Sequence, residues 1–433
     1  MNKRILILST SDNQGAYEAT YKIAKFLYEK KYEVALVVKY QTKYEPFIFQ
    51  VSNIIPRIVR IKEQAIRRYP KLKSILDRNS YKTKFDYSYL TLDENLNLIH
   101  EERILEKISF TPDIIISGMT NGFCTSNTLL ALYKKTNARV YYWLLDMEHL
   151  TGGCHYAWDC NGYENECKNC PAIIDVEKKD RAHQNFLIKR KNITEAGIGV
   201  IAGSGWVRNQ AAKSTFFKHQ NNILNTNSCI DIRLMNNKNR NIAKSLFQVD
   251  KDTKTILVGS LHINDPRKGL KYFLESLDIL WKNLEDEIRE KVIIFVVGEH
   301  YHQTEFVSKI PFKKQIIDYV KDYRLLSLLY QATDIFVCAS IEDSGPMMVS
   351  EALACGTPVV GFEMGIVGTL VKEGYNGYVA PVKNSLELAK GLETIVRLEK
   401  EEFEEYSNNA VKTVELFSSH DYAIKILEQL FEN

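Results

Sequence analysis

Residues 334–362 read DIFVCASIEDSGPMMVSEALACGTPVVGF, and this stretch decides the fold class. Its first part, 335–339, is apolar almost throughout, which is typical of a strand buried on both faces of a parallel sheet. A polar loop follows. A short helix is then predicted between Pro346, which suits the first helical position, and Gly356, which suits the C-terminal one. A second strand over 358–362 completes the repeating unit of an open α/β sheet.

The start of this helix is predicted to bind an anion. Open α/β sheets hold phosphates where the loop after a strand leads into a helix N-terminus. The amides of Met347 and Met348 would point at the anion, and Ser344, which precedes Gly345, would add a hydroxyl. Glu351 lies one turn after Met347 on the same face, so its carboxylate is placed to accept hydrogen bonds from a ribose. The alternative is an ordinary βαβ unit with solvated acids.

These residues resemble the signature of retaining glycosyltransferases of family 4, which have the GT-B fold. That signature is an acid, seven residues and then Glu in a context like EALACGTPVV. Here the two acids are Asp343 and Glu351, where the family usually has two glutamates. The resemblance implies that Glu351 binds the donor ribose. It also implies that Asp343 acts near the transferred sugar, a role that Glu342 could share.

The length supports two domains. At 433 residues the chain is too long for one ordinary core and suits two domains of about 200 residues. With the resemblance, this implies an α/β, GT-B fold: two Rossmann-like domains facing across a cleft that holds the active site. We expect an acceptor-side domain over 1–235 and a donor-binding domain over 236–412, joined by a polar linker at 236–241. The last helix, about 413–433, is expected to pack back on the first domain.

Composition narrows the function classes. Apolar residues make up 45% and charged residues 26% of the chain, ordinary values for a globular protein. A net charge of +3 gives no indication of a nucleic-acid partner. The apolar run 5–8 is too short for a signal peptide or a membrane span. We therefore expect a cytoplasmic location, where disulfides are rare.

A βαβ pattern opens the chain, with strands expected at 5–8 and 32–38 and a helix at 16–29. The loop TSDNQG between the first strand and the helix is not a GxGxxG fingerprint, so NAD binding is not supported. The loop resembles the one in which a family 4 glycine approaches the donor diphosphate, and Gly15 matches that glycine. A tight turn before a helix is the alternative.

Residues 57–84 form a basic segment. It holds ten Lys or Arg against two acids, with apolar residues near helical spacing and a break at Pro70. Such a surface would suit an anionic membrane, and a peripheral position on the inner membrane face follows as a hypothesis. A solvated helical insertion fits the same pattern.

Residues 143–171 read WLLDMEHLTGGCHYAWDCNGYENECKNCP. They resemble a segment of colanic-acid-type and other polysaccharide transferases that carry a His-Asp pair, then TGGCHY, then cysteines ending in CxxCP. A His in this region contacts the donor sugar in many family members, and this chain has Leu145 at that position. We expect Asp146, or His149 three residues on, to replace it as a catalytic residue; loss of the contact is the alternative.

Four cysteines in this segment, Cys154, Cys160, Cys167 and Cys170, are separated by gaps of five, six and two residues. The CxxC half has good metal-ligand spacing and the other half is looser. Structural zinc, free buried thiols and a disulfide all remain open. No catalytic metal is expected, because four thiolates would leave no open coordination position.

The second half restarts the βαβ pattern and supplies cations. By resemblance, Lys268 in the sequence DPRKG neutralises the donor diphosphate and Arg267 assists it; a solvated basic loop is the alternative. Glu299 follows the predicted strand 292–297, and Gly365 matches a family glycine that faces the sugar. These residues complete the predicted donor site.

The function that follows is transfer of a sugar from a nucleotide-sugar donor to a glycan, polysaccharide or lipid-linked acceptor, with retention implied by the resemblance alone. Two rivals remain. A nucleotide-sugar epimerase on the same fold would need groups for proton transfer, and the acid-then-Glu signature argues against it. A non-catalytic nucleotide-sugar-binding subunit is kept open by Leu145 and Asp343.

Overall fold

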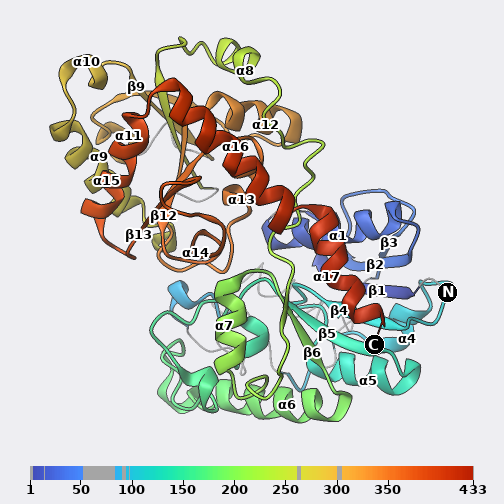
Figure 1. Cartoon of the computed structure of the whole chain (residues 1–433). Coiled ribbons are helices and arrows are strands. Elements are labelled where there is room, and N and C mark those ends of the chain that lie inside the picture. The colour runs from blue at the N-terminus through green and yellow to red at the C-terminus, as the bar shows by residue number, and fades with distance from the viewer. Residues whose placement is uncertain are drawn as a thin grey trace, which may run out of the picture. The chain divides into compact units, whose positions relative to one another are not determined.

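A computed structural model of the chain describes residues 3–13, 15–51, 83–89, 94–96, 98–260, 265–299 and 305–432. The chain divides into two compact units: Met1–Ile201 with Asn209–Ile223, and Ala202–Arg208 with Leu224–Asn433. Each unit is built around its own parallel sheet flanked by helices (Figure 1). The prediction of two α/β domains is confirmed.

The first unit starts with β1 and α1, as the alternating pattern predicts. Strands β2, β1, β4 and β5 pair in parallel, with Ile5 opposite both Val34 and Ile114. The neighbours run β3-β2-β1-β4-β5-β6, in a sheet that β7 (Leu224–Asn225) completes. The other strands of this sheet are β1 (Arg4–Ser11), β2 (Glu33–Tyr40), β3 (Ile48–Gln50), β4 (Ile114–Ser117), β5 (Arg139–Leu144) and β6 (Gly199–Ala202). The α-helices are α1 (Gly15–Glu29), α4 (Glu101–Leu105), α5 (Ser126–Thr136), α6 (Arg181–Ala196) and α7 (Gly205–Lys213), whose residues are divided between the two units.

The second unit holds a six-stranded sheet in the order β10-β9-β8-β11-β12-β13, and all of its pairs are parallel. Its strands are β8 (Lys254–Gly259), β9 (Val292–Val297), β10 (Lys313–Ile317), β11 (Ile335–Cys338), β12 (Val359–Phe362) and β13 (Gly377–Ala380). Its helices are α8 (Arg240–Leu246), α9 (Leu270–Asn283), α10 (Asp286–Arg289), α11 (Glu305–Ser308), α12 (Tyr323–Ala332), α13 (Met347–Ala354), α14 (Val367–Leu370), α15 (Ser385–Val396), α16 (Lys400–Phe417) and α17 (His420–Glu432).

Alternate residues of the second sheet enter two separate cores, which explains the continuous apolar runs in its strands. In β9, Val292, Ile294 and Val296 pack with α9 and α15. Phe295 and Val297 face the other way and pack with α8, α12, α13 and α16. Figure 1 displays these two helix layers around β9 and β12. Both faces are buried, as in parallel sheets generally.

The second compact unit includes the segment from Leu224 on, which comes before the polar stretch 236–241 that the sequence suggests as a linker. Leu224 already belongs to the second unit, because the segment after it pairs with the C-terminal helices. The Ile230 amide donates to the Ser418 carbonyl at 3.0 Å, and Tyr422 Oη of α17 donates to the Asn225 carbonyl at 3.2 Å. Whether the domains divide at 235 and whether α17 packs on the first domain stay predictions.

Helix α13 begins one residue later than predicted. Its first residue is Met347, and Pro346, which the sequence places at the first helical position, is the N-cap, with an extended ψ of 119°.

The basic segment 57–84 lies almost entirely outside the described residues. Within the described part of the chain, no helix is both long and apolar enough to cross a membrane.

Asp334, at the start of β11, ties the second sheet to α8. Its carboxylate lies 2.6 Å from Arg240 Nη2 and 3.1 Å from Lys244 Nζ, and it accepts from the Thr255 amide and hydroxyl, both at 2.8 Å. Burial alone would raise the pKa of Asp334, but the two cations and these hydrogen bonds lower it. The carboxylate is therefore ionised and joins α8, β8 and β11.

We predict that Asp334→Asn lowers the free energy of unfolding at pH 7 by about 3 kcal/mol, because it leaves two partly buried cations without their counter-charge. Since the folded-state pKa is depressed, the stabilisation is present above the unfolded value of about 4 and is lost as the pH falls through the folded pKa. Urea unfolding at pH 7 and below pH 4 measures this free energy. The difference in free energy of unfolding between wild type and variant should be smaller in acid. The exposed acid Asp286, changed to Asn, is the control; equal losses in both variants would contradict the assignment.

Candidate functional site

The site of the second unit lies where the order of its strands reverses. β8 is the first strand in sequence, β9 lies on one side of it and β11 on the other. The loops after β8 and β11 therefore leave the carboxyl edge of the sheet side by side and in opposite directions. Open α/β sheets bind ligands at such a crevice. The cations predicted at 267–268 and the acid at Asp343 lie on these two loops.

Backbone contacts hold the two loops together. The Ile341 amide donates to the Arg267 carbonyl at 2.7 Å. Gly269 has φ of 62°, and a Cβ there would lie 1.9 Å from the Ala339 carbonyl oxygen, so only glycine fits. Asp265 caps the short turn by accepting from the Arg267 amide at 3.1 Å, and its carboxylate also pairs with the Arg267 guanidinium. The positions of Arg267 and Lys268 are thus fixed by backbone.

Lys268 and Asp343, predicted for different roles, form an ion pair. Lys268 Nζ lies 2.5 Å from Asp343 Oδ2, and the Gly345 amide donates to Asp343 Oδ1 at 3.2 Å. Burial by itself would raise the pKa of Asp343, but Lys268, and to a smaller extent Arg267, lower it, so the carboxylate is ionised at neutral pH. The ammonium side chain is about a quarter exposed, whereas the carboxylate is buried. Lys268 can therefore reach a solvent-borne anion while Asp343 orients it.

The start of α13 has the features of an anion site. Its first residues are Met347 and Met348, whose amides belong to the unpaired first turn of an eight-residue helix. The Ser344 hydroxyl is buried and makes no hydrogen bond within the part of the chain that the structure describes. Gly365 packs over this loop with φ of 57°, and a Cβ on it would lie 2.7 Å from the Asp343 carbonyl oxygen. A larger side chain at Gly365 would push the loop away.

Glu351 lies in the second turn of α13 and is buried, at 4% exposure. Tyr330 of α12 donates its hydroxyl to Glu351 Oε2 at 3.2 Å. The hydroxyl of Tyr330 therefore holds the Glu351 carboxylate in place. A glutamate buried this well is uncommon unless it has a partner, and here Tyr330 is one.

Ser204 supports the loop that carries Ser344, a contact that was not predicted from the sequence. The Ser204 hydroxyl donates to the Ser344 carbonyl and accepts from the Val207 amide at 3.2 Å. Gly205 beside it leaves room for Thr369, whose Oγ1 would be 2.5 Å from a Cβ. The sequence GSGW at 203–206 indicates a strand-to-helix junction, but only the fold brings it to Ser344.

In the first unit, Asp146 pairs with His155, which is not among the residues predicted for the site. His155 Nδ1 lies 2.6 Å from Asp146 Oδ2, and the Nε2 of the buried His155 has no partner among the described residues. The ring of His149 is engaged on both sides, by the Gly118 carbonyl at 2.7 Å and the Glu148 carboxylate at 3.0 Å, and it stacks on Tyr142. His149 thus anchors the loop to the end of β4.

A buried charge cluster lies under the same loop and was not predicted. Lys189 of α6 is 1% exposed and donates to Glu148 Oε1 at 2.6 Å, to the Glu148 carbonyl at 2.9 Å and to the Thr151 carbonyl at 3.2 Å. Glu94, 3.9 Å from Lys189 Nζ, has a raised pKa, mainly because of burial. The sequence signal would have been a lysine at an inward-facing position of α6. The cluster fixes residues 148–151 from below.

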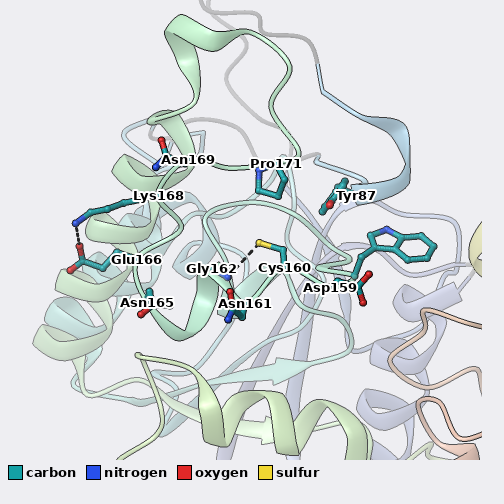
Figure 2. Close-up of a pocket in the computed structure, with 11 residues that line it drawn as sticks. Tyr87, Asp159, Cys160, Asn161, Gly162, Asn165, Glu166, Lys168, Asn169 and Pro171 are labelled. Carbon is teal, nitrogen blue, oxygen red and sulfur yellow. Dashed lines mark hydrogen bonds and ion pairs between the residues drawn. The ribbon is translucent and has the colours of Figure 1, made fainter.

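The four cysteines of the segment meet in the first unit. All four are free thiols that line one small cavity, and burial raises the pKa of Cys167 to about 12. A wider hollow of about 770 Å³ lies beside them. Figure 2 shows residues that line it, among them Cys160, whose Sγ accepts from the Gly162 amide, and the ion pair between Glu166 and Lys168. Backbone turns and scattered polar groups line this hollow, so it indicates no particular ligand.

The remaining predicted residues lie in both units. Gly15 begins α1 in the first unit with φ of 53°, a conformation that favours glycine. Glu299 follows β9 and Gly298 at the carboxyl edge of the second sheet. The structure thus brings Arg267, Lys268, Asp343, Ser344 and Gly365 together in one unit. Their assignment as ligand-binding residues stays a prediction.

Known proteins resemble this chain in both sequence and fold. Residues 241–413 match the protein family described as "Glycosyl transferases group 1". A segment of 147 residues, 34% of the chain, is 28% identical to an uncharacterized glycosyltransferase of Haemophilus influenzae and covers 40% of that protein. Another of 233 residues, 52% of the chain, is 23% identical to the putative colanic acid biosynthesis glycosyl transferase WcaC of Escherichia coli and covers 52% of it. The matches thus span about half or less of the length of these curated relatives.

Solved structures resemble the whole chain. Sucrose-phosphate synthase of Thermosynechococcus elongatus matches 100% of this chain and 98% of its own, with a TM-score of 0.65 and 13% identity. HepE of Anabaena, solved in complex with UDP-glucose, matches 100% of both chains, with a TM-score of 0.60 and 13% identity. At such identities the likeness establishes the fold. The predicted fold, two Rossmann-like domains of the GT-B type, is confirmed.

We predict that Lys268→Met weakens binding of inorganic pyrophosphate by roughly 10- to 100-fold. This range corresponds to the loss of one charge-assisted hydrogen bond, worth about 1.5–3 kcal/mol. Titration calorimetry at low salt measures the affinity. Lys271→Met is the matched control, because Lys271 is 78% exposed and one turn further along the chain. Equal affinities of the two variants would mean that 265–269 is only a surface turn.

Proposed function

We propose that this chain is a glycosyltransferase that moves a sugar from a nucleotide-sugar donor to a glycan, polysaccharide or lipid-linked acceptor. One observation supports the proposal most strongly: the residues that match the family include the candidate site. The family match over 241–413 covers the unit in which Lys268, Asp343 and the start of α13 converge. A structural neighbour of the same fold was solved with UDP-glucose, which makes UDP the first probe to use.

The chemistry would be mainly electrostatic. As the bond between sugar and diphosphate breaks, negative charge develops on the leaving diphosphate. Lys268 and Arg267 carry fixed positive charge on a loop held by backbone, and the first amides of α13 add donors. Preorganised donors of this kind often make the greatest single contribution to an enzyme's rate enhancement. The proposal assigns no metal to this step, since the protein's own cations supply the counter-charge.

The Lys268–Asp343 pair suggests the order of events when the donor binds. We propose that Lys268 leaves Asp343 for the diphosphate when the donor binds, and that Asp343 then faces the transferred sugar. The buried Ser344 hydroxyl would gain its hydrogen bond from the same ligand. Glu351, held by Tyr330, would accept from the donor ribose. Glu299 and Gly365 would line the rest of the donor site, and Gly15 is assigned to the donor diphosphate by its resemblance to the family glycine.

The finer assignment follows from resemblance. We place the chain in family 4, with retention at the anomeric carbon, and near the colanic-acid type because of the segment 143–171 and the relation to WcaC. In the first unit, Asp146 or His149 would replace the sugar-contacting His that the chain lacks at Leu145. Asp146 is paired with His155, so Asp146 and His155 would act together.

Glu351→Gln tests the ribose role. The variant should bind UDP, or whichever nucleoside diphosphate binds best, roughly 10- to 100-fold more weakly, and should bind pyrophosphate as wild type does, because only the ribose contact is lost. Transfer should fall at least as much. Glu387→Gln is the matched control, since Tyr378 donates to Glu387 at 2.7 Å in a similar pair elsewhere in the unit.

Two outcomes would count against the proposal in different ways. Unchanged nucleotide affinity in Glu351→Gln would remove the ribose assignment. Tight binding of a nucleotide-sugar by the wild type, with neither hydrolysis nor transfer of its sugar, would make the protein a binding subunit instead of an enzyme.

The acceptor and location are a separate proposal, which rests on sequence outside the described residues. We propose that the protein works at the cytoplasmic face of an anionic membrane through its basic segment 57–84. Each Lys or Arg near such a surface contributes about 1 kcal/mol, screened by salt. The chain should pellet with anionic vesicles at low salt and stay in solution with neutral ones. Changing Arg67, Arg68, Lys71 and Lys73 to Glu should abolish pelleting; if it does not, the segment is a solvated insertion.

A further inference from the structure

We propose that Cys154, Cys160, Cys167 and Cys170 bind one structural Zn²⁺, independently of any sugar transfer. The four thiols come from the segment after β5 and line one cavity of about 20 Å³. A space of this size holds about one water molecule, so one ion fits and a larger ligand does not. Four cysteines that include a CxxC pair are a common ligand set for structural zinc.

Backbone amides already point at the sulfurs. The Gly152 amide donates to Cys167 Sγ at 3.3 Å, and the Gly162 amide donates to Cys160 Sγ at 3.4 Å. A neutral thiol is a weak acceptor, whereas a metal-bound thiolate needs such donors around it. Two of the four sulfurs thus already accept a backbone hydrogen bond of the kind that a metal-bound thiolate needs.

The backbone between the cysteines turns so that the thiols come close to one another. Cys167 has φ of 52°, a left-handed conformation that is costly for a cysteine, and Asn169, a residue type that tolerates this conformation, has the same φ. These two positions fold the sequence CKNC back on itself. Gly162 lies against the same sulfurs, and a Cβ there would be 3.3 Å from Cys160 Sγ and 3.7 Å from Cys167 Sγ. The backbone thus accepts strain that serves to gather the thiols.

The sulfurs line one cavity, but they are not in the positions of metal ligands. In the described ranges of the chain, no three His, Cys, Asp or Glu side chains are arranged tightly enough to hold an ion. Rotation of the cysteine side chains about their Cα–Cβ bonds would close the site around the metal. On binding, each coordinating thiol gives up its proton and forms one Zn–S bond, so that two negative charges remain on the complex. Lys179 and Lys189 lie near Cys170 and Cys167 and offset this charge.

The metal would fix the loop that carries Asp146. Gly152, bonded through its amide to Cys167, accepts at its carbonyl from Tyr89 Oη at 2.7 Å and from Asn185 at 3.2 Å. A Cβ on Gly152 would lie 2.0 Å from the Ala182 carbonyl oxygen, so the loop is pressed onto α6. Cys154 is followed directly by His155, the partner of Asp146. One zinc would thereby hold both ends of the stretch 146–155.

The test uses the full chain purified without chelator or affinity metal. Elemental analysis should give about one Zn per chain. Replacing Zn²⁺ by Co²⁺ should produce the intense sulfur-to-cobalt absorption and the visible bands of a tetrahedral thiolate site. Cys167→Ser and Cys170→Ser should lose the metal and melt at lower temperature. Cys338→Ser, at a buried thiol in the second unit, should keep the metal.

Three results would overturn the proposal: protein without metal whose four thiols all react with a thiol reagent, cobalt spectra without sulfur bands, or disulfides among these cysteines by mass spectrometry. The wild-type metal content and the cobalt spectrum decide the question even if the serine variants fail to fold. None of these measurements depends on activity, so the zinc site stands or falls apart from the proposed function.

Discussion

The proposed donor site depends on one ion pair, Lys268 with Asp343, at the point where the strand order of the second sheet reverses. The two residues are 75 positions apart in sequence and meet because β8 and β11 are neighbours. A backbone hydrogen bond between their loops and a glycine that tolerates no Cβ fix the meeting point. The pair holds the Lys268 ammonium beside Asp343 and keeps the aspartate ionised before any ligand arrives. Preorganisation of this kind is what a site needs to stabilise charge that develops during a reaction.

The second unit could be predicted well from sequence because its signals are local. The run Val292–Val297 is predicted as a strand and is β9, since residues buried on both faces must all be apolar. The predicted start of α13 is off by one residue, because Pro346 suits both the N-cap and the first turn, and only its ψ of 119° distinguishes them. The prediction of a linker at 236–241 rests on polarity. Polarity cannot reveal that Ile230 forms a bridge with Ser419, between α16 and α17, and the domain boundary stays a prediction.

The first unit shows the limit of reasoning from neighbours in sequence. Asp146 and His149 are candidates because they lie close to Leu145, where the family has a His, and the sequence gives no sign that His155 forms the pair with Asp146. The buried Lys189 and its two glutamates are long-range partners that no short motif contains. The cysteines are predictable as a group from their spacing, and the amide donors that surround them come from turns that only the structure reveals. Function is therefore best read from the sites, while the fold alone admits several chemistries.

A crystal structure with bound UDP, or with the nucleoside diphosphate that stabilises the protein most, would decide whether the second unit binds a nucleotide at the loops after β8 and β11. We expect the diphosphate against Lys268 Nζ and the amides of Met347 and Met348, the Ser344 hydroxyl in contact with it, and the ribose on Glu351. We also expect that Lys268 has left Asp343. A nucleotide bound elsewhere, with the Lys268–Asp343 pair unchanged at 2.5 Å, would show that this ion pair is only structural.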